Sequence, residues 1–236
     1  MLSADMNHGL MLLSRGGLGK TTLVLDSLQE RNLERDKHFI YSNSFMTPLG
    51  FYKLLDRTNQ LKKPNFLILD DIELILSNKH ILGMLRSALW EAGGKRIINY
   101  TSTSEKVEKE ETEFRGKIIL LINSLPKENK ILGALTDRVF FHEINLTNHE
   151  VMHIIKTKIV RKPYKRLTLK QRIKIADAIE ERVTSKVNLS FRTLIKAYQF
   201  YIFNQNHWTV MLDATMGVQP EEGLSTGKDV DRNTLL

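Results

Sequence analysis

The sequence contains no cysteine and no long apolar run. The lack of cysteine excludes disulfide scaffolds, thiol nucleophiles and zinc sites built on thiolates. No stretch of about 18 apolar residues is present, and the first residues lack the basic and apolar regions of an export signal. We therefore expect a cytoplasmic protein with no membrane partner.

The chain of 236 residues is 42% apolar, which is ordinary for a folded protein of one to two domains. Its formal net charge of +8 is unevenly distributed: residues 1–150 carry +1, residues 151–206 carry +10 and residues 207–236 carry −3. A nearly neutral body followed by a strongly basic segment predicts two structural units. The second unit is expected to face a polyanion or an acidic partner.

Apolar runs and amphipathic stretches alternate through the first 146 residues. Strands are predicted at 10–14, 38–42, 66–69, 117–122 and 138–144, with helical patterns between several of them. Continuous apolar strands of this kind favour a parallel sheet covered on both faces. Three helical stretches follow, at 148–160, 168–182 and 190–206. The expected fold class is α/β, a parallel sheet flanked by helices and followed by a small all-helical domain.

The change of pattern and of charge places the domain boundaries. We expect an α/β domain at 1–146, a helical domain at 147–208 and a polar, poorly ordered tail at 209–236. The charged stretch EKVEKEETE, residues 105–113, is expected to be a mobile loop, and the alternative is the tip of a hairpin.

The sequence SRGGLGKT, residues 14–21, fits the phosphate-binding P-loop pattern except that Ser14 replaces the first glycine. Glycines let backbone N–H groups turn toward an anion, and the following helix adds its positive N-terminal end. Lys20 would reach the β- and γ-phosphates, and Thr21 would hold Mg²⁺. The residues expected to bind the nucleotide are Ser14, Arg15, Gly16, Gly17, Leu18, Gly19, Lys20, Thr21 and Thr22.

A second motif, FLILDD, places two carboxylates at the end of an apolar strand. Strand ends of this type face the crevice in which phosphates bind. Asp70 is expected to bind Mg²⁺ through water, and Asp71 to polarise the attacking water. The alternative is a solvated strand terminus.

Together these motifs resemble the AAA+ ATPase family, and the resemblance extends from Leu10 to about Asn206. It implies that Asn123, in IILLINSLP, is the sensor 1 residue that orients the attacking water. Arg138, in ALTDRVFF, looks like the arginine finger that reaches the γ-phosphate of an adjacent subunit, and Arg192 looks like sensor 2 of the helical lid. The plainer alternatives are a strand cap, a surface ion-pair partner and a cation on the face of the lid.

The resemblance implies a mechanism in which ATP and Mg²⁺ lie between subunits of a homo-oligomer. The catalytic residues would be Lys20, Asp71, Asn123, Arg138 and Arg192. Only nine residues precede the first strand, which leaves the base specificity of the nucleotide pocket open. The segments IINYTSTS and GKIILLINSLP resemble short ATPases encoded by phages and other mobile elements, which favours DNA replication or helicase loading.

Residues 156–174 carry nine cations and no acid. We expect many of them to face solvent and to bind DNA through its phosphates, with Tyr164 as a stacking group. The candidate DNA-binding residues are Arg161, Lys162, Lys165 and Arg166. The alternative is a solvated face that contacts a neighbouring subunit. No base-reading element is evident, so sequence specificity is not expected.

Three functions are compatible with these patterns. The favoured one is an oligomeric, DNA-associated ATPase that remodels or loads a helicase or another replication protein. The second is a nucleotide-gated DNA-binding or scaffold module with little turnover, which Ser14 and the short Asp71 carboxylate make credible. The third is a small-molecule P-loop kinase, ranked lower because Asn123, Arg138 and a basic helical domain have no natural role there.

Overall fold

A computed structural model describes residues 8–72, 76–101, 111–125, 133 and 135–217. The chain divides into two compact units, Met1–Leu146 and Thr147–Leu236.

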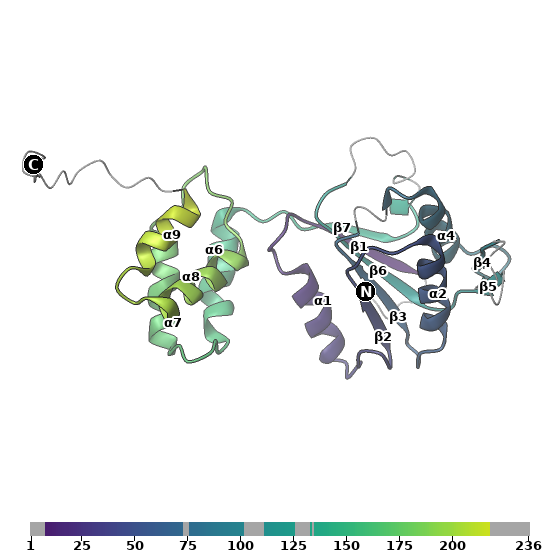
Figure 1. Cartoon of the computed structure of the whole chain (residues 1–236), viewed down its shortest axis with the longest axis horizontal. Coiled ribbons are helices and arrows are strands. Elements are labelled where there is room, and N and C mark those ends of the chain that lie inside the picture. Colours follow the sequence, from purple (N-terminus) through teal and green to yellow (C-terminus); the bar gives the residue numbers. More distant parts are fainter. Residues whose placement is uncertain (1–7, 73–75, 102–110, 126–132, 134, 218–236) are drawn as a thin grey trace, which may run out of the picture. The chain divides into compact units, whose positions relative to one another are not determined.

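The first unit is built on a five-stranded sheet (Figure 1). Its order is β2-β3-β6-β1-β7, and every neighbouring pair of strands is parallel. The strands are β1 Gly9–Leu13, β2 Phe39–Ser42, β3 Phe66–Asp70, β6 Lys117–Ile122 and β7 Phe140–Glu143. The predicted parallel α/β sheet is confirmed.

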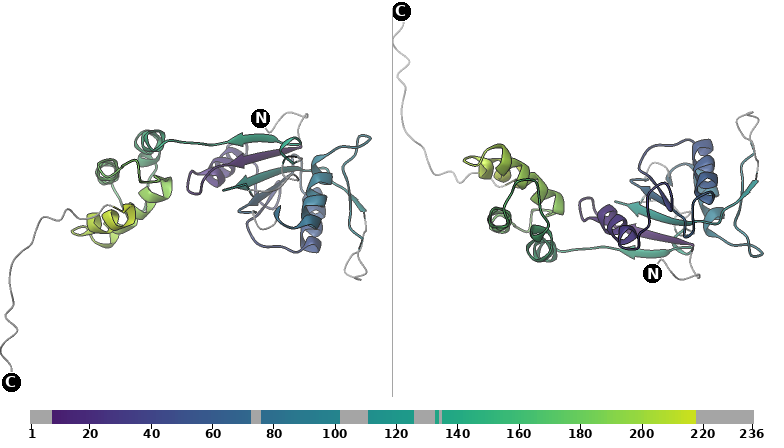
Figure 2. Two further views of the ribbon diagram at one scale, coloured as in Figure 1. Left: turned by 90° about the horizontal axis from the view of Figure 1, so that it is seen from above. Right: turned by 90° about the horizontal axis from the view of Figure 1, so that it is seen from below.

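Helices cover both faces of this sheet. Helix α1, Lys20–Gln29, packs on one face, and α2, Pro48–Asn59, and α4, Lys79–Leu89, pack on the other. The views of Figure 2 show α1 on the opposite side of the sheet from α2 and α4. Successive strand residues alternate between the two cores: Met11 packs with α2 and α4, whereas Leu12 packs with α1. This double burial explains why β1, β3 and β6 are continuously apolar, whereas β7, at the edge of the sheet, is exposed.

The charged stretch 105–113 is partly a strand. Residues Ile97–Asn99 form β4, and Glu111–Glu113 form β5, which pairs with β4 in antiparallel orientation. The expected mobile loop is therefore wrong at 111–113, and residues 102–110 lie outside the described residues. At the centre of this pairing Thr112 lies opposite Ile98, and both residues are buried.

The described residues of the second unit, 147–217, form helices and their connections. It contains α6 Asn148–Thr157, a short 3₁₀ helix at Ile159–Arg161, α7 Leu169–Glu180, α8 Phe191–Phe203 and α9 Trp208–Met216. Thr147 and Thr168 are the N-caps of α6 and α7, and each forms a capping box. The threonine side chain accepts from the backbone N–H of the third helical residue, whose side chain accepts from the threonine N–H. None of the described helices is long and apolar enough to cross a membrane.

Helix α9 differs from the expected poorly ordered tail at 209–236. Trp208, Leu212 and Met216 are spaced four residues apart, so they share one helix face, and all three are buried. The Trp208 ring contacts Tyr201 of α8 edge-on, with 5.5 Å between the ring centroids. The helix ends at Gly217, whose φ of 67° suits a glycine. The rest of the expected tail, residues 218–236, lies outside the described residues.

Candidate functional site

The loop between β1 and α1 has the backbone shape of an anion-binding turn. Gly17 and Gly19 have φ values of 82° and 78°, in the left-handed region that favours glycine. Gly19 is the N-cap of α1 and supplies no side-chain cap to the first turn of the helix. The N–H groups at that end are therefore suited to a bound phosphate.

Lys20 is held inside this loop and is only 6% exposed. Its ammonium donates to the Ser14 carbonyl at 2.7 Å, to Ser14 Oγ at 3.0 Å and to Asn123 Oδ1 at 2.9 Å. A buried ammonium needs such oxygen partners, because its desolvation is otherwise costly. Ser14 therefore supplies a lysine ligand that the glycine of the usual pattern lacks.

Thr21 and Asp70 come together although they belong to different elements. Thr21 Oγ1 donates to Asp70 Oδ2 at 2.6 Å, and Asp70, the last residue of β3, is 6% exposed. Hydroxyl and carboxylate oxygens suit Mg²⁺, which in nucleotide sites takes one or two protein groups and completes its shell with phosphates and water. No cluster of three or more histidines or acids forms a metal site among the described residues. The Thr21 and Asp70 pair fits a nucleotide-bound magnesium ion.

Asn123 joins the lysine to the second carboxylate. It follows β6, which lies between β1 and β3 in the sheet. Its amide nitrogen donates to Asp71 Oδ1 at 2.6 Å, while its amide oxygen accepts from Lys20. Because both ends of the amide are engaged, its orientation is fixed. The structure thus brings five of the predicted site residues to the carboxyl ends of three adjacent strands: Lys20, Thr21, Asp70, Asp71 and Asn123.

Asp71 has a strained backbone. Its φ is 52°, a conformation that costs a residue other than glycine about 1 kcal/mol. Its N–H donates to the Leu121 carbonyl at 3.2 Å and to Asp70 Oδ1 at 3.1 Å. The side chain is exposed, so a water molecule can reach it. Strain of this kind persists where the surrounding structure over-determines the backbone, which is common at active sites.

Tyr41, near the end of β2, is a site residue that the sequence patterns do not reveal. Its hydroxyl donates to Asp70 Oδ2 at 2.7 Å. Burial, together with this hydrogen bond to the Asp70 carboxylate, raises the pKa of Tyr41 to about 12. The only available signal is its place near the end of an apolar strand, because the contact depends on β2 lying beside β3.

The remaining residues of the predicted phosphate loop have different surroundings. The Arg15 guanidinium donates to the Leu146 carbonyl at 3.2 Å, at the end of the first unit. Leu18 is buried, whereas Gly16 and Thr22 are exposed. Leu18 therefore serves packing, and Gly16 and Thr22 remain accessible to a ligand.

Arg138 lies away from the phosphate loop of its own chain. It precedes β7, whose Phe140 pairs with Leu10 at the start of β1, whereas the loop follows the end of β1. Val139 lies beside Gly9, the first residue of β1, and the five residues of β1 span about 16 Å from that end to the loop. The Arg138 guanidinium lies 5.1 Å from the ring centroid of Trp90, and that ring is 58% exposed.

The predicted residues of the second unit lie on its surface. Arg192 is exposed in the first turn of α8. The four candidate DNA-binding residues are all exposed in the connection between α6 and α7: Arg161, Lys162, Lys165 and Arg166. The Tyr164 ring packs against Tyr198, with the centroids 4.9 Å apart, so one face of the expected stacking group is already covered.

Two cations of the basic stretch at 156–174 have partners within the second unit. Lys156 pairs with Asp177 at 2.9 Å and with Glu180 at 2.6 Å. Arg172 is buried and donates to the carbonyls of Val160 at 2.8 Å and Leu167 at 2.5 Å. Arg172 thereby ties together the two ends of the basic connection.

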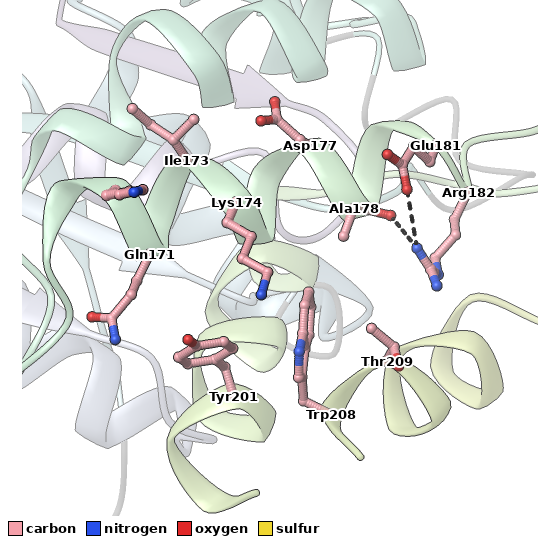
Figure 3. Close-up of a pocket in the computed structure, with 11 residues that line it drawn as sticks. Gln171, Ile173, Lys174, Asp177, Ala178, Glu181, Arg182, Tyr201, Trp208 and Thr209 are labelled. Atoms are coloured by element: carbon pink, nitrogen blue, oxygen red, sulfur yellow. Dashed lines mark hydrogen bonds and ion pairs between the residues drawn. The ribbon is translucent and has the colours of Figure 1, made fainter. Parts of the chain in front are cut away.

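A hollow of about 710 Å³ lies between α7, the last turn of α8 and the first turn of α9 (Figure 3). Lys170 and Lys174 line it together with Asp177 and Glu181, and Trp208 forms part of its apolar wall. The lining contains both acids and bases, so this surface is not a continuous basic patch. The basic surface of the second unit is therefore centred on the connection at 158–166.

The parallel sheet with its phosphate loop, followed by the helical unit, is the fold that this chain shares with solved RuvB structures. No family model and no curated protein matches the sequence. The solved structures that share the fold include the RuvB Holliday junction branch migration motor of Thermotoga maritima, with a TM-score of 0.50 at 16% identity. An arginine-to-alanine variant of that RuvB matches with a TM-score of 0.51 at 15% identity. Each match covers 91% of this chain and 64% of the RuvB chain.

Proposed function

We propose that the chain binds and hydrolyses ATP with Mg²⁺ and uses that cycle in a DNA transaction. One observation carries the ATPase proposal: Lys20, Thr21, Asp70, Asp71 and Asn123 converge through hydrogen bonds at the end of the parallel sheet. One lysine, one hydroxyl, two carboxylates and one amide around a glycine loop are groups of the kind that phosphoryl transfer uses.

Each side chain then has a distinct task. Lys20 would bind the terminal phosphates, while Thr21 and Asp70 would hold the magnesium ion. When bound, Mg²⁺ supplies a Lewis acid that neutralises charge on the phosphate oxygens. Asp71 would accept a hydrogen bond from the attacking water, and Asn123 fixes the position of the Asp71 carboxylate.

A homo-oligomer with ATP at its subunit interface is the assembly that best supports this chemistry. Arg138 lies near the opposite end of β1 from its own phosphate loop, and β1 spans about 16 Å, so a role in catalysis requires another copy's nucleotide. An arginine finger of this kind is worth about 10³–10⁵ in rate in other phosphoryl-transfer systems. Arg192 is proposed to sense the nucleotide from the helical unit, as a sensor 2 residue of a lid.

The DNA proposal rests on the exposed cations between α6 and α7 and is supported by the fold. The similar RuvB structures are those of a Holliday junction branch migration motor. The narrower proposal of replication or helicase loading, with a helicase or another replication protein as partner, stays a prediction. The resemblance to phage and mobile-element ATPases likewise stays a prediction, because the comparisons support the AAA+ fold and not this narrower type.

A nucleotide-gated DNA-binding or scaffold module is the second candidate. It is favoured by Asp71, which has a shorter side chain than glutamate and is already hydrogen-bonded to Asn123. In that case ATP binding would control assembly, and turnover would be incidental.

ATP turnover and nucleotide affinity, measured on the same preparations, separate the two candidates. For the ATPase, Lys20→Ala should abolish nucleotide binding, whereas Asp71→Asn should keep binding and lose turnover. Lys53→Ala, which alters an exposed lysine of α2, is the matched control and should behave like the wild type. Tight nucleotide binding with no turnover in the wild type, with or without DNA, would favour the gated module instead.

A further inference from the structure

The Asp70 carboxylate accepts three hydrogen bonds in this structure. Thr21 Oγ1 and the Tyr41 hydroxyl both donate to Oδ2, at 2.6 Å and 2.7 Å, and the Asp71 N–H donates to Oδ1 at 3.1 Å. Both hydroxyl donors therefore act on one oxygen. Because the donors come from α1 and from β2, they restrain the carboxylate from two sides.

Tyr41 is itself firmly placed. Its strand, β2, pairs with β3 in parallel register, with Tyr41 opposite Ile68. The ring packs against the apolar cluster beneath α1, and the Arg35 guanidinium lies 5.4 Å from the ring centroid. The phenol thus reaches Asp70 from a ring whose position is set by packing.

We propose that Tyr41 is a positioning residue for the magnesium site, which fixes the Asp70 carboxylate in the orientation that serves the cation. This inference rests on the proposed function, because it assumes that Thr21 and Asp70 hold nucleotide-bound Mg²⁺. Groups that orient a metal-binding carboxylate by hydrogen bonding typically change metal affinity about 10- to 100-fold when they are removed.

The chemistry of a phenol suits this task. A tyrosine hydroxyl ordinarily ionises only near pH 10, so it is protonated throughout the neutral range. Tyr41 therefore remains a hydrogen-bond donor and adds no charge to a site that already contains two adjacent carboxylates. A serine or threonine at the same strand position would lack the length of the aromatic ring.

Tyr41→Phe tests the proposal because it removes the hydroxyl and keeps the ring. A fluorescent ATP analogue is titrated onto the full chain at fixed Mg²⁺ concentrations and in EDTA. The Mg²⁺ concentration that gives half of the metal-dependent gain in affinity should rise about tenfold. Affinity in EDTA should not change. Tyr52→Phe, which removes another partly desolvated hydroxyl of the same unit, is the matched control and should match the wild type.

A double variant that combines Tyr41→Phe with Asp70→Asn shows whether Tyr41 acts through Asp70. If it does, Tyr41→Phe should cause no further change in the Mg²⁺ response of the Asp70→Asn chain. An unchanged Mg²⁺ response in Tyr41→Phe, or equal losses in both backgrounds, overturns the inference. A wild type that binds the analogue with no Mg²⁺ dependence instead overturns the proposed magnesium site, so the two failures are distinguishable.

Discussion

The Asn123 amide donates to Asp71 Oδ1 across 2.6 Å, although the two residues are 52 positions apart in the sequence. Asp71 is exposed and has a left-handed backbone, so this contact restrains a side chain that would otherwise be free to rotate. The other end of the same amide accepts from Lys20. Asn123 thereby couples the phosphate-binding lysine to the carboxylate proposed to orient water.

Asn123→Ala should lower ATP turnover by roughly 10² and leave nucleotide affinity within a few-fold of the wild type. The reason is that Asp71 loses its positioning partner, and a positioned acid or base contributes about 10²–10⁴ in rate. Steady-state turnover and equilibrium binding of a fluorescent nucleotide give the two values. Ser124→Ala, at the exposed neighbouring position, is the control. Equal losses of binding and turnover would show that Asn123 serves the loop and not Asp71.

Arg138→Ala should reduce turnover about 10³-fold or more, with nucleotide binding retained, if this arginine serves a neighbouring copy. Mixing it with Lys20→Ala provides the decisive measurement. In a 1:1 mixture, about a quarter of the interfaces combine an intact Lys20 site with an intact Arg138. Turnover should therefore reappear at about a quarter of the wild-type level. A mixture no more active than its separate components would contradict the action of Arg138 across an interface.

Neutralising Arg161, Lys162, Lys165 and Arg166 together should weaken DNA binding and its salt dependence. Four lost phosphate contacts make the slope of log affinity against log salt less negative by about 3. Fluorescence anisotropy with labelled single- and double-stranded DNA at several salt concentrations measures this slope. A charge-matched control replaces four exposed lysines of the first unit, Lys53, Lys62, Lys63 and Lys79. Equal effects of the two quadruple variants would indicate a response to net charge alone.

Tyr198→Phe should leave stability at pH 7 within about 1 kcal/mol of the wild type. The Tyr198 hydroxyl is buried and has no hydrogen-bond partner among the described residues, so removing it breaks no contact. Burial raises the pKa of Tyr198 to about 12, above its ordinary value of 10. The unfolded chain therefore loses this proton first, and stability falls between pH 10 and 12.

The Tyr198→Phe variant has no hydroxyl at this position, so it lacks this pH-dependent loss of stability. The free energy of unfolding of the variant should accordingly rise, relative to that of the wild type, by up to about 1.4 kcal/mol per pH unit in the same window. Urea unfolding of both chains, followed by circular dichroism at pH 7 and at pH 11, provides the comparison. A constant difference between the two chains at the two pH values would mean that Tyr198 ionises as readily in the folded state as in the unfolded state.

Local patterns were sufficient for the sheet and for the glycine loop. The apolar run at 66–69 predicts the observed β3, Phe66–Asp70, to within one residue. The prediction succeeds because a strand that is buried on both faces is apolar almost throughout. Patterns failed where an element depended on distant partners. Residues 209–216 form a helix because Trp208, Leu212 and Met216 find a buried surface, and the polar composition of 209–236 taken as a whole does not reveal that spacing.

The sequence by itself determined the α/β alternation, the phosphate loop and the carboxylates that end β3, since each depends on residues close together in the chain. Only the tertiary structure decided that Tyr41 reaches Asp70, that Arg138 lies far from its own loop and that Arg172 is a buried tie. The physical reason is the order of the strands. Parallel neighbours are joined by crossovers, so the chain sequence does not state which strand ends meet.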